Sequence, residues 1–213
     1  LAGGNTGVQM GGWFNKEINS LEDLKGLKMR IPGLGGEVLQ RAGGTPVTLP
    51  GAELFTALQT GAIDATEWVG PYNDLAFGLH KAAKYYYYPG WHEPGSMLEF
   101  TVNKPAFESL PKDLKAIVRT ASRAINQDML DEYTARNNHA LKDLVNKHNV
   151  QLRAYPKEVL RKLRDLSEKV LVEVAGSDPM AKKAYDSFKA FKDNVQEYHA
   201  LTEQAFLNAR NAK

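Results

Sequence analysis

The chain has 213 residues, of which 43% are hydrophobic and 24% are charged, as is usual for a globular protein. Its formal net charge of +2 is too small to indicate nucleic-acid binding, and its lysines are scattered rather than clustered. The absence of cysteine excludes disulfides and thiolate metal sites. No apolar run approaches the roughly 20 residues of a membrane-spanning helix. The chain opens without Met, at LAGGNTGVQMGGWF, which suggests a processed or partial chain.

Up to about residue 103, stretches typical of strands alternate with stretches typical of helices. Strands are expected at 27–33, 45–50, 62–69, 84–90 and 97–104, and helices at 20–26, 36–44 and 52–61. Ser20 is the expected N-cap of the first helix, with Asp23 at the capping-box position. The alternation predicts an α/β layer with parallel or mixed strands, in which ligands bind beyond the carboxyl ends of the strands. Arg30, Glu67 and Trp68 all lie at such ends.

After residue 111 the chain is expected to be helical. A short strand at 150–155 precedes a helix from Pro156 to about Val174, and GSDP at 176–179 predicts a break. A C-terminal helix of more than thirty residues follows. Apolar residues spaced alternately three and four apart form a heptad pattern along it: Ala181, Ala184, Phe188, Phe191, Val195 and Tyr198. The pattern fits either a helix packed on its own domain or one that docks on a second subunit.

Arg30 lies in KMRIPG, within a strand whose other members are mostly apolar. A guanidinium in that position needs an anion, and its planar fork suits a carboxylate bidentately. The anion could be an Asp or Glu of the same chain or the carboxylate of a ligand. A strand-end arginine that faces water is a third alternative.

Glu67 and Glu93 lie beside tryptophans and helix breakers, in IDATEWVGP and YYYYPGWHEPG, and not on a polar helix face. They could be a catalytic acid/base pair, two ligands of a cation, or ordinary surface acids. Two glutamates with backbone carbonyl or amide oxygens are hard ligands that suit calcium or sodium. Gln9, in GVQMGG, could supply the amide oxygen, although a polar loop or strand residue is the simpler interpretation.

Several enzyme and cofactor motifs are missing from the sequence. The five histidines show no metal spacing such as i, i+4, so zinc is not expected. There is no GxSxG nucleophile elbow. GxGxxG and Walker sequences are also absent, so nucleotide cofactors are poorly supported.

Two long motifs resemble a known family. SLEDLKGLKMRIPG, followed by GGTPVTLPGAELFTALQTGAIDATEWVGP, is similar to the signature region of the solute-binding subunits of TRAP transporters. These are bacterial periplasmic proteins that deliver organic acids to a membrane transporter. KYYYYPGWHEPG resembles the branch of that family that binds 2-oxo and 2-hydroxy acids together with a metal cation. The resemblance covers essentially the whole chain, and the order and spacing of the motifs agree.

The resemblance implies a role for each candidate residue. Arg30 would pair with the solute carboxylate, while Glu67, the main-chain carbonyl of Trp68, and Glu93 would coordinate a calcium or sodium ion, with Gln9 as its amide ligand. The ion would bridge to the carboxylate and the 2-oxo or 2-hydroxy oxygen of a pyruvate- or lactate-like monocarboxylate, which also places Trp68 and Gln9 beside the solute. No proton transfer, and hence no enzymatic activity, is implied.

The resemblance also implies a periplasmic-binding-protein-like α/β fold with two lobes, a mixed sheet, a long hinge helix and a long C-terminal dimerisation helix. Residues 1–103 would be mainly the second ligand-binding lobe with crossover strands, 104–175 the hinge helix and remainder of the first lobe, and 176–213 the C-terminal helix, exchanged between the subunits of a homodimer. A signal peptide and most of the first lobe precede this region in family members, so the chain would be a fragment of a periplasmic protein whose partners are TRAP membrane subunits.

Two other functions remain as alternatives. One is a metal-dependent lyase or hydrolase that acts on a carboxylate substrate, with one glutamate as base. The other is a helical dimerisation module without a ligand, which rests on residues 180–210. Turnover of a bound oxoacid would favour the first, and bound calcium would argue against the second.

Overall fold

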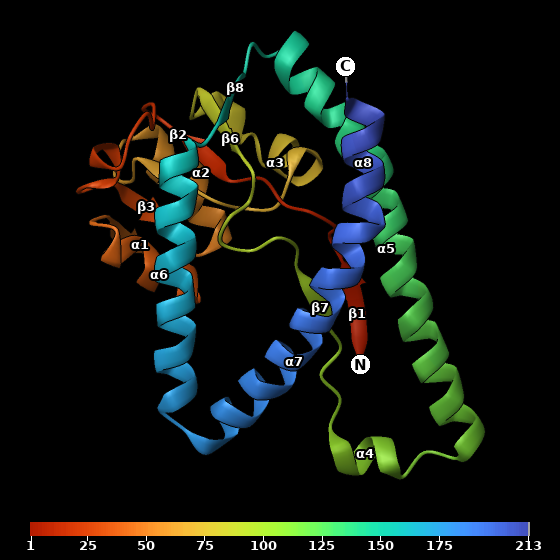
Figure 1. The fold of residues 1–213 in the computed structure, drawn as a ribbon. Helices are drawn as coiled ribbons and strands as arrows, with labels where there is room; N and C mark the ends of the chain where they lie inside the picture. Colours follow the sequence, from red (N-terminus) through yellow and green to blue (C-terminus); the bar gives the residue numbers. More distant parts are fainter. Residues whose placement is uncertain (213) are drawn as a thin grey trace. The chain divides into compact units, whose positions relative to one another are not determined.

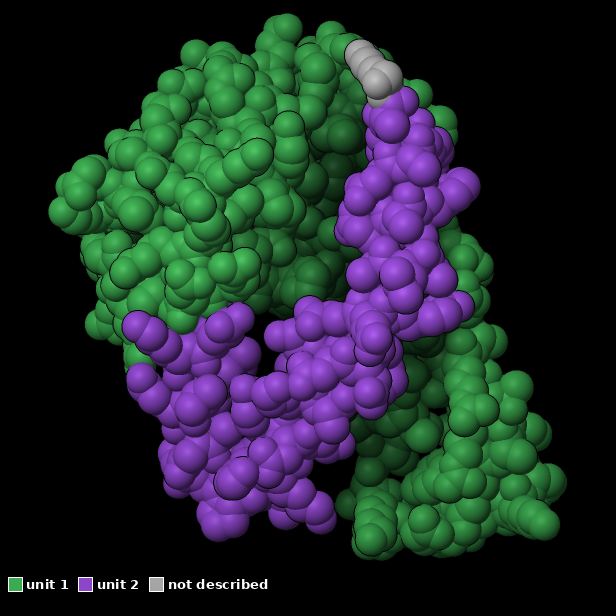
Figure 2. All heavy atoms as spheres, in the orientation of Figure 1, with its two compact units in different colours: residues 1–166 green, residues 167–213 purple. Residues whose placement is uncertain are grey.

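The computed structural model describes residues 1–212, and the chain divides into two compact units, residues 1–166 and 167–213, which are coloured separately in Figure 2. The first unit contains a six-stranded sheet with strand order β4-β3-β5-β2-β6-β8. Four of these strands, β2, β3, β6 and β8, are labelled in Figure 1. The bounds of its strands are β2 Gly12–Phe14, β3 Lys28–Arg30, β4 Thr45–Val47, β5 Ala65–Thr66, β6 Tyr85–Tyr88 and β8 Gln151–Ala154. The sheet confirms the predicted α/β class, although each strand is shorter than its apolar stretch.

The sheet is mixed, as predicted, and its strand directions decide which residues share an edge. β3 pairs parallel with β4 and β5, and β6 pairs parallel with β8. β2 lies between β5 and β6 and runs antiparallel to both. The carboxyl ends of β3, β5 and β6 therefore lie at one edge of the sheet, whereas β2 ends at the opposite edge.

Six helices and three 3-10 turns connect or follow these strands. They are α1 Gly33–Arg41, α2 Leu54–Gln59, α3 Pro71–Phe77, α4 Lys104–Glu108, α5 Lys112–Asn146, α6 Lys157–Gly176, η1 Glu22–Leu24, η2 Gly51–Glu53 and η3 Leu79–Lys81. The expected helix over 20–26 is wrong, because only the turn η1 forms there. The Asp23 carboxylate accepts hydrogen bonds from the N–H groups of Asn19 (2.8 Å) and Ser20 (2.9 Å), and these bonds hold a tight turn instead of a capped helix.

A separate two-stranded antiparallel sheet joins β1, Ala2–Asn5, to β7, Met97–Glu99. The sequence did not predict β1 or β2, because AGGN is rich in glycine, which is depleted in strands, and GWF is only three residues long. The strand expected over 97–104 ends at Glu99, and the four side chains at 97, 98, 100 and 102 are exposed. β7 and the segment that follows it therefore present apolar side chains to solvent.

Aromatic side chains fill the core on both faces of the six-stranded sheet. Trp13 stacks on Tyr86 with their ring centroids 4.0 Å apart, while Tyr87 makes an edge contact with Phe14 at 4.9 Å. Simple alternation along YYYY predicts two inward tyrosines on one face and two outward ones on the other. Instead the neighbours Tyr86 and Tyr87 are both buried, because both faces of this strand are covered, and Tyr88 is exposed.

The second unit consists of the end of α6 and the helices α7, Pro179–Leu201, and α8, Glu203–Asn211. The predicted break is confirmed, and Asp178 caps α7 by accepting hydrogen bonds from the N–H groups of Met180 and Ala181. The expected continuous C-terminal helix is wrong at Thr202, whose hydroxyl donates to the carbonyl of Tyr198 and whose backbone leaves the helical conformation. Within residues 1–212, no helix is both long and apolar enough to cross a bilayer.

Candidate functional site

Arg30 and Glu67 meet at the carboxyl edge of the sheet. Arg30 lies opposite Thr66 across the parallel strands β3 and β5, so Glu67, the next residue, follows β5 at the same edge. The Arg30 guanidinium donates through Nη1 to Oε1 of Glu67, and the two side chains are only 13% and 4% exposed. The ion pair explains how both charges can be buried. The partner of Arg30 within the chain is thus an acid, and its role toward a ligand carboxylate remains a prediction.

Glu93 and His92 approach the same glutamate from the segment that follows β6. His92 Nε2 lies 3.3 Å from Glu67 Oε2, and the His92 side chain is 4% exposed. One ligand atom from each of Glu67, His92 and Glu93 lies within 4.8 Å of the other two. The structure therefore brings together the two acids that the sequence singled out. The sequence did not predict His92 at the site, and its only signal was its position next to Glu93.

Gln9 reaches this cluster through Ser96, which the sequence did not predict at the site. Gln9 Nε2 donates to Ser96 Oγ at 2.8 Å, and Ser96 Oγ donates to Glu93 Oε1 at 2.5 Å. The backbone N–H of Ser96 donates to Thr6 Oγ1 at 2.9 Å, which holds the serine in place. With its amide nitrogen engaged by Ser96, Gln9 directs its carbonyl oxygen elsewhere. Ser96 is thus a positioning residue for both Gln9 and Glu93.

The oxygen atoms gathered in this cluster are suitable ligands for a hard cation. Gln9 is buried, and its Oε1 atom has no hydrogen-bond partner among the described residues. A buried acceptor left unsatisfied costs about 1–3 kcal/mol, so a ligand for this oxygen is favoured. Carboxylate and amide oxygens are the ligands that calcium and sodium prefer. The carboxylates of Glu67 and Glu93 outnumber the single guanidinium of Arg30, which leaves negative charge at the site for a cation to offset.

Trp68 lies beside the ion pair. The Arg30 guanidinium carbon is 5.5 Å from the centroid of the Trp68 ring, which is a cation–π arrangement. The indole Nε1 of Trp68 is buried and has no partner among the described residues. A Cβ atom at Gly51 would lie 2.8 Å from the Trp68 ring, so the indole can lie here only because residue 51 is glycine. The sequence placed Trp68 at a strand end without revealing this close approach.

Asp74, on α3, is a buried carboxylate close enough to Glu67 for their charges to interact. Its Oδ2 atom accepts from Trp13 Nε1 (2.9 Å) and from the Tyr86 hydroxyl (2.7 Å), and its Oδ1 atom accepts from the Val69 N–H (3.2 Å). These bonds tie the segment that follows Glu67 to the aromatic core. Burial raises the pKa of Asp74 to about 6, and its hydrogen bonds oppose part of that rise.

We expect Asp74 to make the stability of the protein depend on pH. Because its pKa rises from 3.8 to about 6 on folding, its contribution to the free energy of unfolding is full below about pH 4 and is lost as the pH rises through 6. At about 1.4 kcal/mol per pKa unit, the free energy of unfolding falls by up to about 3 kcal/mol over this range. Asp74→Asn removes this titration, so urea denaturation from pH 4 to 7 should show wild type losing stability relative to the variant.

Asp23 provides a control of opposite sign for this measurement. The N–H of Asn19 lowers the pKa of the Asp23 carboxyl, so its contribution to stability is lost as the pH falls, not as it rises. The difference in the free energy of unfolding between wild type and Asp23→Asn should therefore disappear at low pH. A difference between wild type and Asp74→Asn that stays constant from pH 4 to 7 would contradict the prediction for Asp74.

The long helix α5 also supports the segment that carries Glu67 and Trp68. Gly70, at the N-cap of α3, has no side chain to cap the helix, and the Tyr72 N–H donates instead to Asn137 Oδ1 of α5 at 2.9 Å. Asn73 Nδ2 donates to the hydroxyl of Tyr133, also on α5, at 3.0 Å. No sequence pattern predicts these contacts, because the partners are 60 or more residues apart.

Comparison with known proteins identifies relatives over nearly the whole chain. Residues 2–178 match the family described as bacterial extracellular solute-binding protein, family 7 (DctP). The monocarboxylate 2-oxoacid-binding periplasmic protein of Nostoc sp. is 46% identical over 96% of this chain and 56% of its own length. The chain thus spans only about half the length of that curated relative.

Solved structures agree with this assignment. A TRAP periplasmic solute-binding protein from Colwellia psychrerythraea, with bound calcium and pyruvate, is 47% identical with a TM-score of 0.93, over 98% of this chain and 64% of that one. One from Pseudoalteromonas atlantica, with sodium and pyruvate, is 46% identical with a TM-score of 0.92, over 100% of this chain and 64% of that one. These matches confirm the predicted periplasmic-binding-protein fold and the resemblance noted in the sequence. The chain belongs to the DctP family of extracellular solute-binding proteins, the solute-binding subunits of TRAP transporters.

Proposed function

We propose that the protein captures a small 2-oxo or 2-hydroxy monocarboxylate, of the pyruvate or lactate type, in the periplasm and delivers it to the membrane subunits of a TRAP transporter. In this proposal Glu67, Glu93, Gln9 and the main-chain carbonyl of Trp68 hold a calcium or sodium ion. Arg30 binds the solute carboxylate, and Gln9 and Trp68 lie beside the solute. The relatives bound to pyruvate with calcium or with sodium support both ion assignments equally.

The observation that carries the proposal is the pairing of two glutamates with a buried, unsatisfied amide oxygen. Ligand atoms of Glu67 and Glu93 converge, and Oε1 of Gln9 is left without a partner beside the Ser96 bridge. When bound, a cation offsets the repulsion between the two acids and supplies positive charge for an organic acid. Arg30 offers its fork to the solute carboxylate while Glu67 keeps the guanidinium at the sheet edge.

The lobe assignment belongs to the same proposal. Residues 1–103 would form mainly the second lobe, 104–175 the hinge helix and the remainder of the first lobe, and closure of the lobes would trap the solute. The exposed side chains of Met97, Leu98, Phe100 and Val102 support this division, because they form an apolar surface on which further strands of the first lobe could pack.

A homodimer through residues 176–213 is also proposed. Phe188, Phe191 and Tyr198 of the heptad pattern on α7 are 55%, 67% and 65% exposed, so this face is open to a second subunit. A structure from Bordetella bronchiseptica that is 38% identical with a TM-score of 0.91, over 98% of this chain and 62% of that one, is a mixed-occupancy dimer with copurified calcium and picolinate.

Calorimetry tests the proposed binding. The full-length gene product is expressed and treated with EDTA. It is then titrated with pyruvate in the presence and absence of 1 mM Ca²⁺. We expect pyruvate affinity to rise at least about 100-fold when calcium is added, since the cation supplies charge that Arg30 alone does not. Equal affinity with and without calcium and sodium would refute a cation-dependent site.

The same samples distinguish the alternatives. A lyase or hydrolase would convert pyruvate or lactate, so proton NMR of the mixture over hours should show the acid unchanged if the proposal is right. Both carboxylate oxygens of Glu67 already contact positive or donor groups, Arg30 and His92, which makes it a poor free base. A dimerisation module without a ligand would contain no calcium on elemental analysis.

A further inference from the structure

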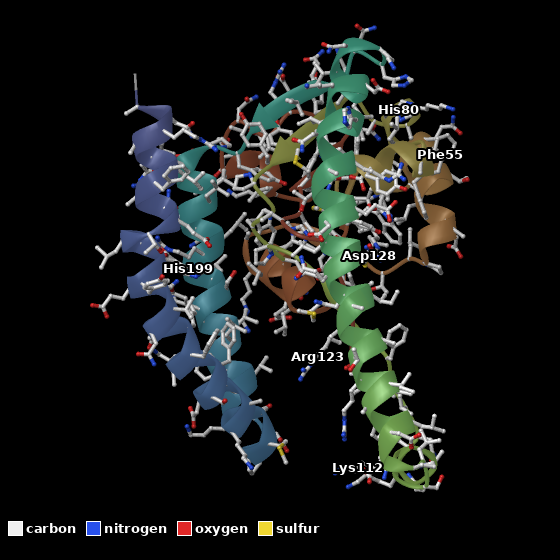
Figure 3. The ribbon with its side chains drawn as sticks, turned by 90° about the vertical axis from the view of Figure 1, so that its right-hand side faces the viewer. Phe55, His80, Lys112, Arg123, Asp128 and His199 are labelled. Carbon is white, nitrogen blue, oxygen red and sulfur yellow. The ribbon has the colours of Figure 1, made fainter. Side chains whose placement is uncertain are left out.

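A second cluster of polar side chains lies at the sheet edge opposite Arg30 and Glu67. Lys84 and Val150 precede the parallel strands β6 and β8, and Asn15 follows the antiparallel β2, so all three lie at that edge. His80, in η3, lies beside the C-terminal end of α5, whose other end is marked by Lys112 (Figure 3). These elements surround a hollow of about 280 Å³, large enough for several water molecules of about 30 Å³ each.

The hollow carries positive charge without a compensating acid. Its polar lining consists of Asn15, His80, Lys81, Lys84, His148 and Asn149, with no carboxylate among the lining residues. Within residues 1–212, neither Lys81 nor Lys84 has a carboxylate within 4.0 Å. The Lys84 ammonium lies 5.5 Å from the centroid of the Tyr85 ring. A concave surface that is lined by charges of one sign concentrates the electric field and attracts counter-ions.

His80, one of the two histidines of the hollow, lacks hydrogen-bond partners among the described residues. The rings of His80 and His148 are 4.3 Å apart, and both ring nitrogens of His80 are buried without a partner among the described residues. Burial lowers the pKa of His80, and the neighbouring His148 and Lys81 lower it further. His148 is exposed, and both histidines line the hollow. An anion would accept a hydrogen bond from the N–H of His80 and would also supply the missing negative charge.

We propose that this hollow is a second binding site, for a small dianionic oxyanion of the phosphate or sulfate class. Lys81 and Lys84 neutralise its two negative charges, while His148 and the Asn149 amide donate hydrogen bonds to its oxygens. Asn149 adopts a left-handed conformation (φ 55°), which turns the chain from α5 into β8 at the rim. A metal ion fits less well, because two ammonium groups would repel it and the lining offers no carboxylate ligand.

Histidine-ring NMR tests this site with inorganic phosphate as the probe. Phosphate is added up to 20 mM at constant ionic strength, maintained with sodium chloride, while the five imidazoles are followed. We expect the resonances of His80 and His148 to shift in a saturable manner with a dissociation constant on the order of 1 mM, and the pKa of His80 to rise. His139 and His199 should not respond.

Variants make the assignment specific. Lys81→Ala and Lys84→Ala should each weaken phosphate binding about tenfold, whereas Lys25→Ala, whose ammonium is paired with Glu22 on the surface, should not. Pyruvate affinity should be unchanged in all three, since the two sites lie at opposite sheet edges, so this test is independent of the proposed function. Any one of four results would overturn the proposal: no saturable shift, an equal response to sodium chloride alone, a shift confined to His92, or a response to equimolar zinc without one to phosphate.

Discussion

Replacing Glu67 with Gln is expected to weaken calcium-dependent pyruvate binding by at least about 100-fold, equivalent to about 2.7 kcal/mol. Glu67 is a buried carboxylate at the centre of the cluster, with one oxygen on Arg30 and the other 3.3 Å from His92. A neutral amide would remove one of the two negative charges proposed to hold the cation, and outer-shell changes alone commonly cost 10–100-fold in metal affinity. Calorimetric titration of the variant with pyruvate in calcium measures the loss.

Loss of folding must be separated from loss of binding in this experiment. Glu67→Gln also removes the acid paired with Arg30, and breaking a buried pair costs about 3–5 kcal/mol of stability. Glu93→Gln leaves that pair intact and should still weaken pyruvate binding, while Glu37→Gln, which breaks an exposed pair with Arg41, should not. Unchanged pyruvate affinity in a folded Glu67→Gln protein, or in Glu93→Gln, would refute the proposed cation ligands.

Replacing Trp13 with Ala is expected to lower the free energy of unfolding by about 3–5 kcal/mol, the usual cost of deleting a buried large aromatic side chain. Trp13 is fully buried, stacks on Tyr86, and donates its indole N–H to Asp74. The variant loses both the ring contacts and one of the hydrogen bonds that hold the buried Asp74 carboxylate. Urea denaturation monitored by circular dichroism at pH 7 measures the effect.

Two further variants calibrate that result. Tyr86→Phe removes only the hydroxyl that donates to Asp74 and should cost about 1–2 kcal/mol. Leu34→Ala, at a side chain that is 45% exposed, should change stability by no more than about 0.5 kcal/mol. A Trp13→Ala protein as stable as Leu34→Ala would show that the aromatic stack contributes little to the fold.

The sequence alone determined the class of the fold and which residues deserved scrutiny. Alternating strand and helix patterns predicted the α/β layer, and the position of Arg30 and Glu67 after apolar strand residues predicted their place at a carboxyl edge. These signals are local, because side-chain periodicity and turn preferences depend on residues that are close together in the sequence. Where the local signal was weak, as in the glycine-rich β1 and at Thr202, the predicted elements were wrong or missing.

Only the tertiary structure decided which partners these residues have. Arg30 and Glu67 are 37 residues apart, Gln9 and Ser96 are 87 apart, and His80 and His148 are 68 apart, so no sequence periodicity relates them. Their contacts depend on sheet order, which puts β3 beside β5 and reverses β2 between β5 and β6. Strand pairing is set by the packing of the whole core and not by local propensity, which is why the cluster around Glu67 and the basic hollow at the opposite edge became visible only in three dimensions.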